Sequence, residues 1–215
     1  MNTNKKISGN QTADQLILTA ALKEFSSRGF SGARIDEIAE KTNFSKRMIY
    51  YYFKDKQDLF VRCLEKEYQK LREAESKIDI SIDNPIKDLQ KIIETSIDHH
   101  FENQDYVRLV VIENIHYCKH LDLSERIQAE SMNSVDVTSD VYNRGVKNGL
   151  FRSGINPLDI HWMIASMSFF SISNKYSFNW VHNLPPYDES QHKSRKKFIL
   201  DVVLNHLLVK PQHAK

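Results

Sequence analysis

The chain has 215 residues and a mass of 25.2 kDa, which suits one larger domain or one domain plus a small one. Apolar residues make up 40% and charged residues 27%, as in globular rather than disordered proteins. The net charge is +2, with ten Lys/Arg against seven Asp/Glu in residues 1–60 and twenty against twenty-one in the remainder. This bias is modest, so charge alone does not establish a nucleic-acid partner.

Cys63 and Cys118 are the only cysteines, and their spacing excludes a disulfide framework. The N-terminus lacks the pattern of a secretory signal. The longest uncharged stretch, residues 160–174, is shorter than the roughly 20 apolar residues of a membrane span. We therefore expect a cytoplasmic protein with no membrane partner.

Glycine and proline are scarce, and helical periodicity recurs almost everywhere, so the sequence predicts an all-α fold. After a polar tail over residues 1–11, Thr12 and Gln15 fit a capping box for the first helix, and Gly29 is expected to end it. Asn43 suits a left-handed turn, and Ser45 suits a helix cap. The further helices are expected at 35–42, 46–53, 55–76, from 85, from 103 or 105 to about 115, and at 124–147, 157–182 and 190–209, with an extended connector at 77–83.

The second and third predicted helices are short and joined by a tight turn, which is typical of a helix-turn-helix unit. In the third helix, Ile49 and Phe53 are four residues apart and are expected to face the core. Three consecutive tyrosines cannot all be buried on one helix face. Basic and aromatic side chains that project from a helix N-terminus suit the major groove of DNA, where cations meet phosphates or guanine and rings contact thymine methyl groups.

The stretch 12–60 resembles the DNA-binding domain of the TetR family of transcriptional regulators. The resemblance rests on motifs at fixed spacing: Gly29-Phe30, Ile38-Ala39, Phe44-Ser45-Lys46, Ile49-Tyr50-Tyr51-Tyr52-Phe53-Lys54-Asp55-Lys56 and Leu59. It implies a bacterial homodimer with a three-helix reading head over residues 12–56. It also implies an effector-binding and dimerisation domain over 57–215, and a repressor that a small molecule releases from a palindromic operator.

Carried over onto this sequence, the resemblance implies nine DNA-contacting residues: Arg34, Ser45, Lys46, Arg47, Met48, Tyr50, Tyr51, Tyr52 and Lys56. Arg34, Tyr52 and Lys56 stand at positions of phosphate contact, and Lys46, Arg47, Met48, Tyr50 and Tyr51 face the groove. Ala33 and Asn43 depart from the commoner Thr and Gly; the first loses a cap, and the second can still adopt the turn.

The helices expected at 157–182 and 190–209 are apolar on more than one face, so each needs a second partner surface. In the family, this pair resembles the helices that form the dimer interface. An effector cavity should be apolar with a few placed polar groups. Candidate lining residues are His100, Arg108, Glu113, Asn114, Tyr117, Tyr142, Trp162, Ser166, Phe170 and Asn174.

Two questions stay open at this point. Glu113 and Asn114 either contact a ligand or lie at a satisfied helix junction. His116 and His120 are one turn apart, but neither the His-Glu-x-x-His motif nor cysteines at metal spacing accompany them. We therefore expect no metal, no cofactor and no catalytic site. An activator or a nucleoid-associated DNA binder of the same fold, and a helical small-molecule or metal-binding protein, are the alternatives.

Overall fold

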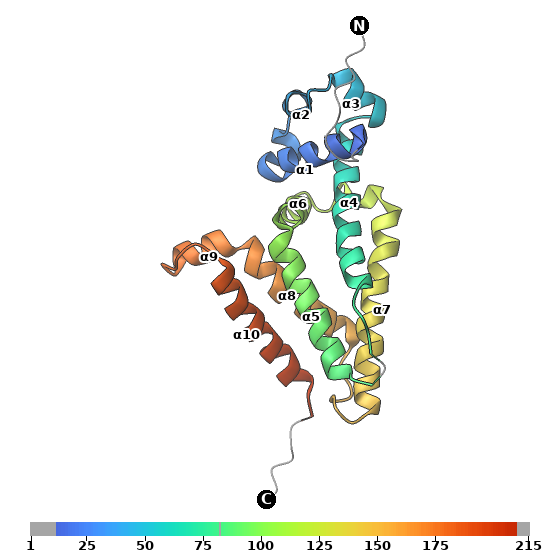
Figure 1. Cartoon of the computed structure of the whole chain (residues 1–215), viewed down its shortest axis with the longest axis vertical. Coiled ribbons are helices and arrows are strands. Elements are labelled where there is room, and N and C mark those ends of the chain that lie inside the picture. The colour runs from blue at the N-terminus through green and yellow to red at the C-terminus, as the bar shows by residue number, and fades with distance from the viewer. Residues whose placement is uncertain (1–11, 82, 210–215) are drawn as a thin grey trace, which may run out of the picture. The chain divides into compact units, whose positions relative to one another are not determined.

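The computed structural model describes residues 12–81 and 83–209, so the polar tail and Ile82 lie outside the described residues. The described chain is helical (Figure 1), and its one extended pairing is an isolated bridge between Phe151 and Leu208. The all-α prediction is confirmed. The elements are α1 (Ala13–Gly32), α2 (Ile35–Thr42), α3 (Lys46–Tyr52), α4 (Lys56–Ser76), α5 (Pro85–Glu102), α6 (Gln104–Ile115), the 3-10 turn η1 (Leu121–Leu123), α7 (Glu125–Lys147), α8 (Pro157–Ser173), α9 (Lys175–Val181) and α10 (Glu189–Leu207).

The chain divides into two compact units. We name them after the roles expected from the sequence. The reading unit contains the described residues up to Glu67 together with Arg108–Ser124, and the effector unit contains Tyr68–Val107 and the described residues from Glu125 onward. The division therefore falls later in the chain than the boundary expected after residue 56. The physical reason is that the first half of α4 contributes its apolar side chains to the core of the reading unit.

The core of the reading unit is aromatic. The ring centroids of Phe25 and Phe60 lie 4.9 Å apart in an edge-to-face contact, and those of Phe30 and Phe60 lie 5.3 Å apart. Ile17, Ala21 and Phe25 of α1 are fully buried, as are Ile38 and Ile49 from the next two helices. The core therefore fixes α3 through one face only.

Two details of α1 follow the sequence prediction, and one differs. The Gln15 side chain accepts a hydrogen bond from the Thr12 amide at 3.2 Å, as a capping box requires. Gly29 leaves the helical conformation at φ 69° and ψ 174°, which glycine adopts without steric cost. The chain nevertheless resumes a helical turn after this kink, as far as Gly32.

In the effector unit, α5 packs against α7, α8 and α10 (Figure 1). Asn84, Asn156 and Asp188 cap α5, α8 and α10 by accepting a backbone N–H in the first turn. The shared core is aliphatic apart from two large rings, Tyr142 and Phe151, and the Phe151 ring lies against Gly145. Its fully buried members include Leu89, Ile93, Val141, Ile160, Ile199, Val203 and Leu207.

The single helix predicted for 157–182 is wrong in one respect, because Asn174 divides it into α8 and α9. The Asn174 backbone is non-helical at φ −107° and ψ 5°, and its side chain donates a hydrogen bond to the hydroxyl of Ser173 at 2.8 Å. A short polar side chain that bonds locally competes with helical hydrogen bonding. No helix within the described ranges is both long enough and apolar enough to cross a membrane.

Candidate functional site

The turn between α2 and α3 has the predicted geometry. Asn43 adopts the left-handed conformation at φ 56° and ψ 26°. The Ser45 hydroxyl then accepts a hydrogen bond from the amide of Met48 at 3.2 Å and caps α3. These two local interactions set the direction in which α3 leaves the turn.

Only one face of α3 is anchored. Ile49 is fully buried, and Phe53 after the helix is 5% exposed. Tyr51 is 79% exposed, and its ring makes an edge-to-face contact with Tyr52 at 5.2 Å between centroids. The rest of the helix presents cations, a thioether and hydroxyl-bearing rings to solvent; this exposed face consists of Lys46, Arg47, Met48, Tyr50, Tyr51 and Tyr52.

An acidic residue on α2 lies against this face. Asp36 forms an ion pair with the Lys46 ammonium at 2.5 Å and a longer one with Arg34 at 3.8 Å. All three side chains are well exposed, so the pairs contribute little to stability. They hold Arg34 at the N-terminal end of α2 and Lys46 at the N-terminal end of α3, and both are cations expected to contact DNA.

A buried carboxylate positions α2. Glu24 of α1 is fully buried and contacts the Lys41 ammonium at 2.6 Å, the Arg28 guanidinium at 3.2 Å and the Arg34 amide at 3.4 Å. Burial raises the pKa of Glu24, but Lys41, the Arg34 amide and Arg28 together outweigh it and hold the pKa below its usual value. The sequence analysis did not select Glu24. The one local sign of its burial is that this glutamate lies among the buried apolar residues of α1.

Lys56 lies at the start of α4 and is half-buried. Its ammonium donates to the Ser31 carbonyl at 3.4 Å and lies 5.0 Å above the Phe30 ring. Burial lowers the pKa of Lys56, and the negative charge of Glu24 opposes this in part. The ammonium of Lys56, which the sequence predicts to contact a phosphate, therefore binds a backbone carbonyl of α1 next to the kink at Gly29.

The effector unit contains a cavity of about 250 Å³ between α4, α5, α7 and α8, which we call the inner cavity. Its walls are mostly apolar, with a few polar groups from helices far apart in sequence. The lining residues are Arg72, Glu75, Ser76, Ile78, Ile92, Ser96, Val137, Thr138, His161, Ile164 and Ala165.

Arg72 is the main charge of the inner cavity. Its side chain is 17% exposed and pairs with Glu75 at 2.6 Å, while its buried Nε has no hydrogen-bond partner among the described residues. Burial raises the pKa of Glu75, and Arg72 lowers it in part. Burial, and then the charge of Arg72, lower the pKa of His161, so this imidazole is neutral at neutral pH. The site can therefore offer a guanidinium N–H to an acceptor.

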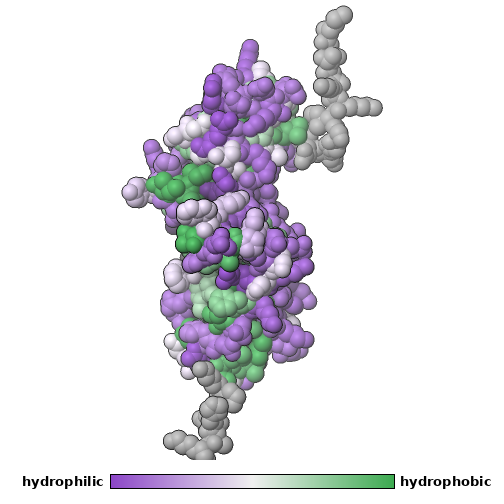
Figure 2. Space-filling view, turned by 90° about the vertical axis from the view of Figure 1, so that its left-hand side faces the viewer, coloured by the Kyte–Doolittle hydropathy of each residue, from purple (hydrophilic) through white to green (hydrophobic). Residues whose placement is uncertain are grey.

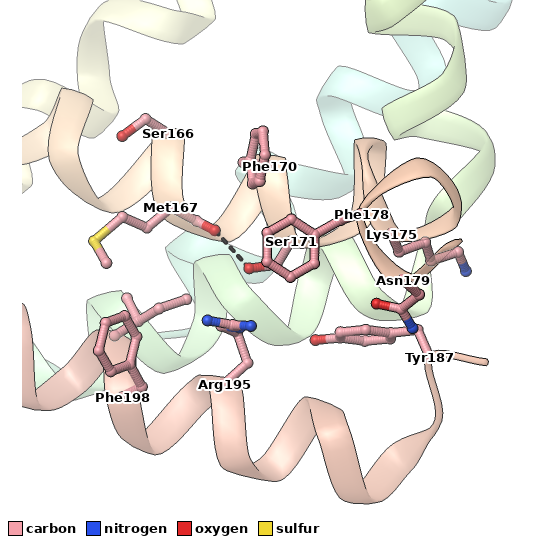
Figure 3. Close-up of a pocket in the computed structure, with 11 residues that line it drawn as sticks. Ser166, Met167, Phe170, Ser171, Lys175, Phe178, Asn179, Tyr187, Arg195 and Phe198 are labelled. Atoms are coloured by element: carbon pink, nitrogen blue, oxygen red, sulfur yellow. Dashed lines mark hydrogen bonds between the residues drawn. The ribbon is translucent and has the colours of Figure 1, made fainter. Parts of the chain in front are cut away.

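A second cavity of about 350 Å³ lies between α8, α9 and α10, and we call it the outer cavity (Figure 3). Ser166 and Phe170 are the two sequence candidates that line it. Its other lining residues are Met167, Ser171, Lys175, Phe178, Asn179, Tyr187, Arg195, Phe198 and Ile199.

Four other sequence candidates in the effector unit line neither cavity. His100 is buried, and its Nδ1 contacts the Ser168 hydroxyl at 3.0 Å. Tyr142 is a core residue whose hydroxyl bonds backbone groups after α7. Trp162 is 70% exposed, and Asn174 lies at the break between α8 and α9.

The remaining four, Arg108, Glu113, Asn114 and Tyr117, belong to the reading unit and line neither cavity. Arg108 donates to the Ser26 carbonyl at 2.6 Å, and Asn114 donates to the Val110 carbonyl of its own helix at 2.8 Å. Tyr117 is exposed at 93%.

Glu113 is fully buried and accepts hydrogen bonds from the amides of His120 and Leu121 at 3.0 and 3.1 Å. Its other oxygen contacts His120 Nδ1 at 2.7 Å. Of the two roles that the sequence left open, the structure therefore favours a satisfied helix junction. His120 is committed to this carboxylate, His116 is exposed, and no three metal-ligating side chains converge within the described part of the chain.

Sequence reasoning did not select Arg72, His161, Tyr187 or Arg195. The first two come together only through the packing of α4 and α8, and the last two through the packing of α10 and the loop before it. Only His161 lies in a largely apolar segment, whereas Arg72 and Arg195 lie in charged segments and Tyr187 follows two prolines, so no local signal sets these three apart.

Two family models match the chain. Residues 17–63 match the model for bacterial regulatory proteins of the tetR family, and residues 85–203 match the tetracyclin repressor-like C-terminal domain. The transcriptional repressor NicS of Pseudomonas putida is 32% identical over 96% of this chain and 99% of its own length. The repressor SCO4008 of Streptomyces coelicolor is 33% identical over 47% of this chain and 49% of its own.

Solved structures share the fold. The putative transcriptional regulator SCO4942 of Streptomyces coelicolor superimposes with a TM-score of 0.68 at 21% identity, covering 91% of this chain and 98% of that one. The regulator FadR of Bacillus subtilis, solved with stearoyl-CoA, gives a TM-score of 0.67 at 17% identity over 89% and 97% of the two chains. With both domain models and a full-length relative in agreement, the chain belongs to the TetR family of helix-turn-helix transcriptional regulators.

Proposed function

We propose that this regulator is a homodimeric repressor that reads a palindromic operator through α3 and is released by a small molecule bound in the inner cavity. The observation that carries the DNA-binding part is the exposed face of α3, held in place by the burial of Ile49. A full-length relative, NicS, is named a transcriptional repressor, which supports the sign of regulation.

The chemistry of α3 suits a major groove. Lys46 and Arg47 at its N-terminal end offer N–H donors to phosphates or guanine edges, and Arg34 adds a third cation at the start of α2. Tyr50 and Tyr51 offer ring faces to thymine methyl groups and hydroxyls to phosphates. Each phosphate contact releases counterions, so we expect operator affinity to fall steeply with salt.

Exposed apolar side chains on α8, α9 and α10 support a dimer. Figure 2 shows hydrophobic groups among polar ones on the side of the molecule where α9 and α10 lie. A two-fold pairing of this surface removes these groups from water and matches the symmetry of a palindromic operator. The large exposed groups on these helices are Leu158, Trp162, Phe170, Tyr176, Trp180, Val181 and Phe198.

The inner cavity supports release by an effector because α4 contributes to its wall and also to the reading unit. Arg72, Glu75 and Ser76 near the end of α4 line the cavity, while Leu59 and Phe60 near its start are buried in the core of the reading unit. A helix is stiff along its axis, so a ligand that shifts one end of α4 acts on the other. Release requires that the ligand bind the DNA-free state of the protein more tightly than the DNA-bound state.

The test begins with selection of the operator from a pool of random duplexes, followed by fluorescence anisotropy against a scrambled duplex at two salt concentrations. We expect Arg47→Ala and Tyr51→Ala each to weaken operator binding by about tenfold or more, since each removes a direct contact of about 1–3 kcal/mol. Lys193→Ala, which removes an exposed cation on α10, is the matched control and should leave affinity unchanged.

Unchanged affinity in the α3 variants would contradict the assignment of the reading helix. Equal affinity for operator and scrambled duplex would instead identify a non-specific, nucleoid-type binder. For the effector, Arg72→Met should retain operator binding and lose release by a ligand that dissociates the wild-type complex. Release that survives in Arg72→Met would remove the inner cavity from the proposal.

A further inference from the structure

The outer cavity has an uneven distribution of charge. Two of its lining residues, Lys175 and Arg195, are cationic, and none of those described is acidic. The Lys175 ammonium is nearly buried and donates to Gln104 at 2.5 Å; Figure 3 shows it directed away from the centre of the cavity. Arg195 is therefore the cation that this cavity offers to a ligand.

Arg195 lacks a carboxylate partner among the described residues, although three basic neighbours on α10 have one. Lys193 pairs with Glu189 at 3.1 Å, and both His192 and Lys196 contact Asp98, at 3.0 and 2.6 Å. The Arg195 guanidinium instead lies over the Phe198 ring, 5.7 Å from its centroid. Stacking of this kind leaves the N–H groups at the edge of the guanidinium free to bind an anion.

Tyr187 adds a second donor to the same space. Its hydroxyl is buried and has no hydrogen-bond partner within the described part of the chain. Figure 3 shows this hydroxyl and the Arg195 guanidinium pointing into the cavity from neighbouring positions. Burial raises the pKa of Tyr187, and Arg195 opposes this only in part, so the hydroxyl is protonated at neutral pH and can donate. A buried hydroxyl without a partner is costly, and an acceptor would remove that cost.

The remaining walls suit an apolar body. Phe170, Phe178 and Phe198 supply three rings, and Met167 and Ile199 supply aliphatic surface. The volume of about 350 Å³ falls in the range of small-molecule sites and exceeds what one carboxylate group needs. An oxyanion held by Arg195 and Tyr187, joined to an apolar body against the rings, matches both the two donors and the apolar walls of the cavity.

We propose that the outer cavity is a second ligand site, separate from the inner cavity, and that it binds a small organic carboxylate with an apolar body. The carboxylate accepts from the Arg195 guanidinium and from the Tyr187 hydroxyl, and the body packs against the phenylalanine rings. The other possible occupant of Arg195 is an acidic side chain of the second copy, because Phe170 and Phe198 also belong to the surface proposed for dimerisation.

The experiment is calorimetric titration of the full chain with 3-phenylpropionate and octanoate, each compared with its own amide. We expect at least one carboxylate to bind with a Kd below about 1 mM and at least about tenfold more tightly than its amide, because only the carboxylate forms a charge-assisted hydrogen bond with Arg195. Arg195→Met should remove this preference, and Tyr187→Phe should weaken carboxylate binding severalfold.

Two control variants locate the site. Lys193→Met removes a cation two residues away on α10 that pairs with Glu189 outside the cavity, and it should bind as the wild type does. Arg72→Met removes the cation of the inner cavity and should also leave this binding unchanged. Helix content by circular dichroism and dimer affinity by sedimentation are measured for every variant.

Three results would overturn the proposal. The first is the absence of saturable carboxylate binding, or equal binding of acid and amide. The second is loss of binding in Arg72→Met with retention in Arg195→Met, which would assign the ligand to the inner cavity. The third combines two observations: the wild type binds no carboxylate, and the Arg195→Met dimer dissociates. This result would mean that Arg195 pairs with an acidic residue of the second copy.

Discussion

The buried carboxylate of Glu113 should determine the stability of the loop between α6 and α7. The loop contains two consecutive non-glycine residues with positive φ, Tyr117 at 57° and Cys118 at 58°. Such residues are held only by surrounding interactions. Glu113 supplies these by accepting from the amides of His120 and Leu121 and from the imidazole of His120. We therefore expect Glu113→Ala to destabilise the reading unit.

The size of the effect follows from the donors that lose their acceptor. An unsatisfied buried donor costs about 1–3 kcal/mol, and Glu113→Ala leaves two backbone amides and one imidazole N–H without their partner. Water can reach Leu121, which is half-buried, so we expect a net loss of about 3 kcal/mol. Glu113→Gln keeps an oxygen for the amides, and its NH₂ can donate to Nδ1 of the other imidazole tautomer, so it should cost about 1 kcal/mol or less.

The assay is urea unfolding followed by circular dichroism, together with hydrogen exchange measured on peptides that span residues 116–124. Glu113→Ala should lower the unfolding midpoint and raise exchange in this loop by roughly thirtyfold or more, whereas Glu113→Gln should stay close to wild type. Equal stability of the alanine variant and the wild type would refute the reasoning. Effector release should be unchanged in the glutamine variant, because Glu113 lines neither cavity.

Three further predictions concern backbone and burial. A Cβ at Gly145 would lie 1.9 Å from the Phe151 ring, so Gly145→Ala should cost about 1–3 kcal/mol in urea unfolding, and no loss would mean that the ring can move aside. At the turn before α3, Asn43→Ala should cost about 1 kcal/mol and Asn43→Gly almost nothing, with operator affinity following stability. Burial lowers the pKa of His99 to about 4. Burial, and to a smaller extent the charge of His99, lower the pKa of His100 to about 3. Their neutral forms are therefore favoured in the fold, and this stability is complete above pH 6.5 and decreases as the pH falls towards 3. The loss should reach about 2 kcal/mol for each histidine at pH 5, and urea midpoints that are equal at pH 7 and pH 5 would contradict it.

The reading unit was predictable from sequence to a large extent because its signals are local. The capping residues Thr12 and Ser45 and the left-handed Asn43 act within four residues of chain, and the structure confirms each. The exposed tyrosines of α3 follow from counting, since one helix face cannot bury three in succession. Glu24 could not be found in this way, because its partners Lys41 and Arg34 meet it only when α2 packs on α1.

The effector unit was predictable in its helices but not in its cavities. Periodicity placed α5, α7 and α10, while the break at Asn174 depends on a side-chain bond that no periodicity records. Of the ten candidate lining residues, Ser166 and Phe170 line the outer cavity, and the other eight line neither of the two described cavities. One polar residue on an apolar helix looks the same whether it faces a ligand, a neighbouring helix or solvent. Glu113 shows the difficulty most clearly: its neighbours in sequence suggest a buried polar group, and only the folded loop shows what satisfies it.

The sequence by itself determined the family, the helical fold and the helix-turn-helix unit, because these depend on motifs and contacts between residues one or two turns apart in the chain. Tertiary structure alone decided which charges are paired and which remain available. Arg72 retains an unsatisfied N–H beside Glu75, and Arg195 lies beside the buried hydroxyl of Tyr187, since helices distant in the chain pack together there. The availability of a buried charge depends on every group around it, and those groups are adjacent only in the folded protein.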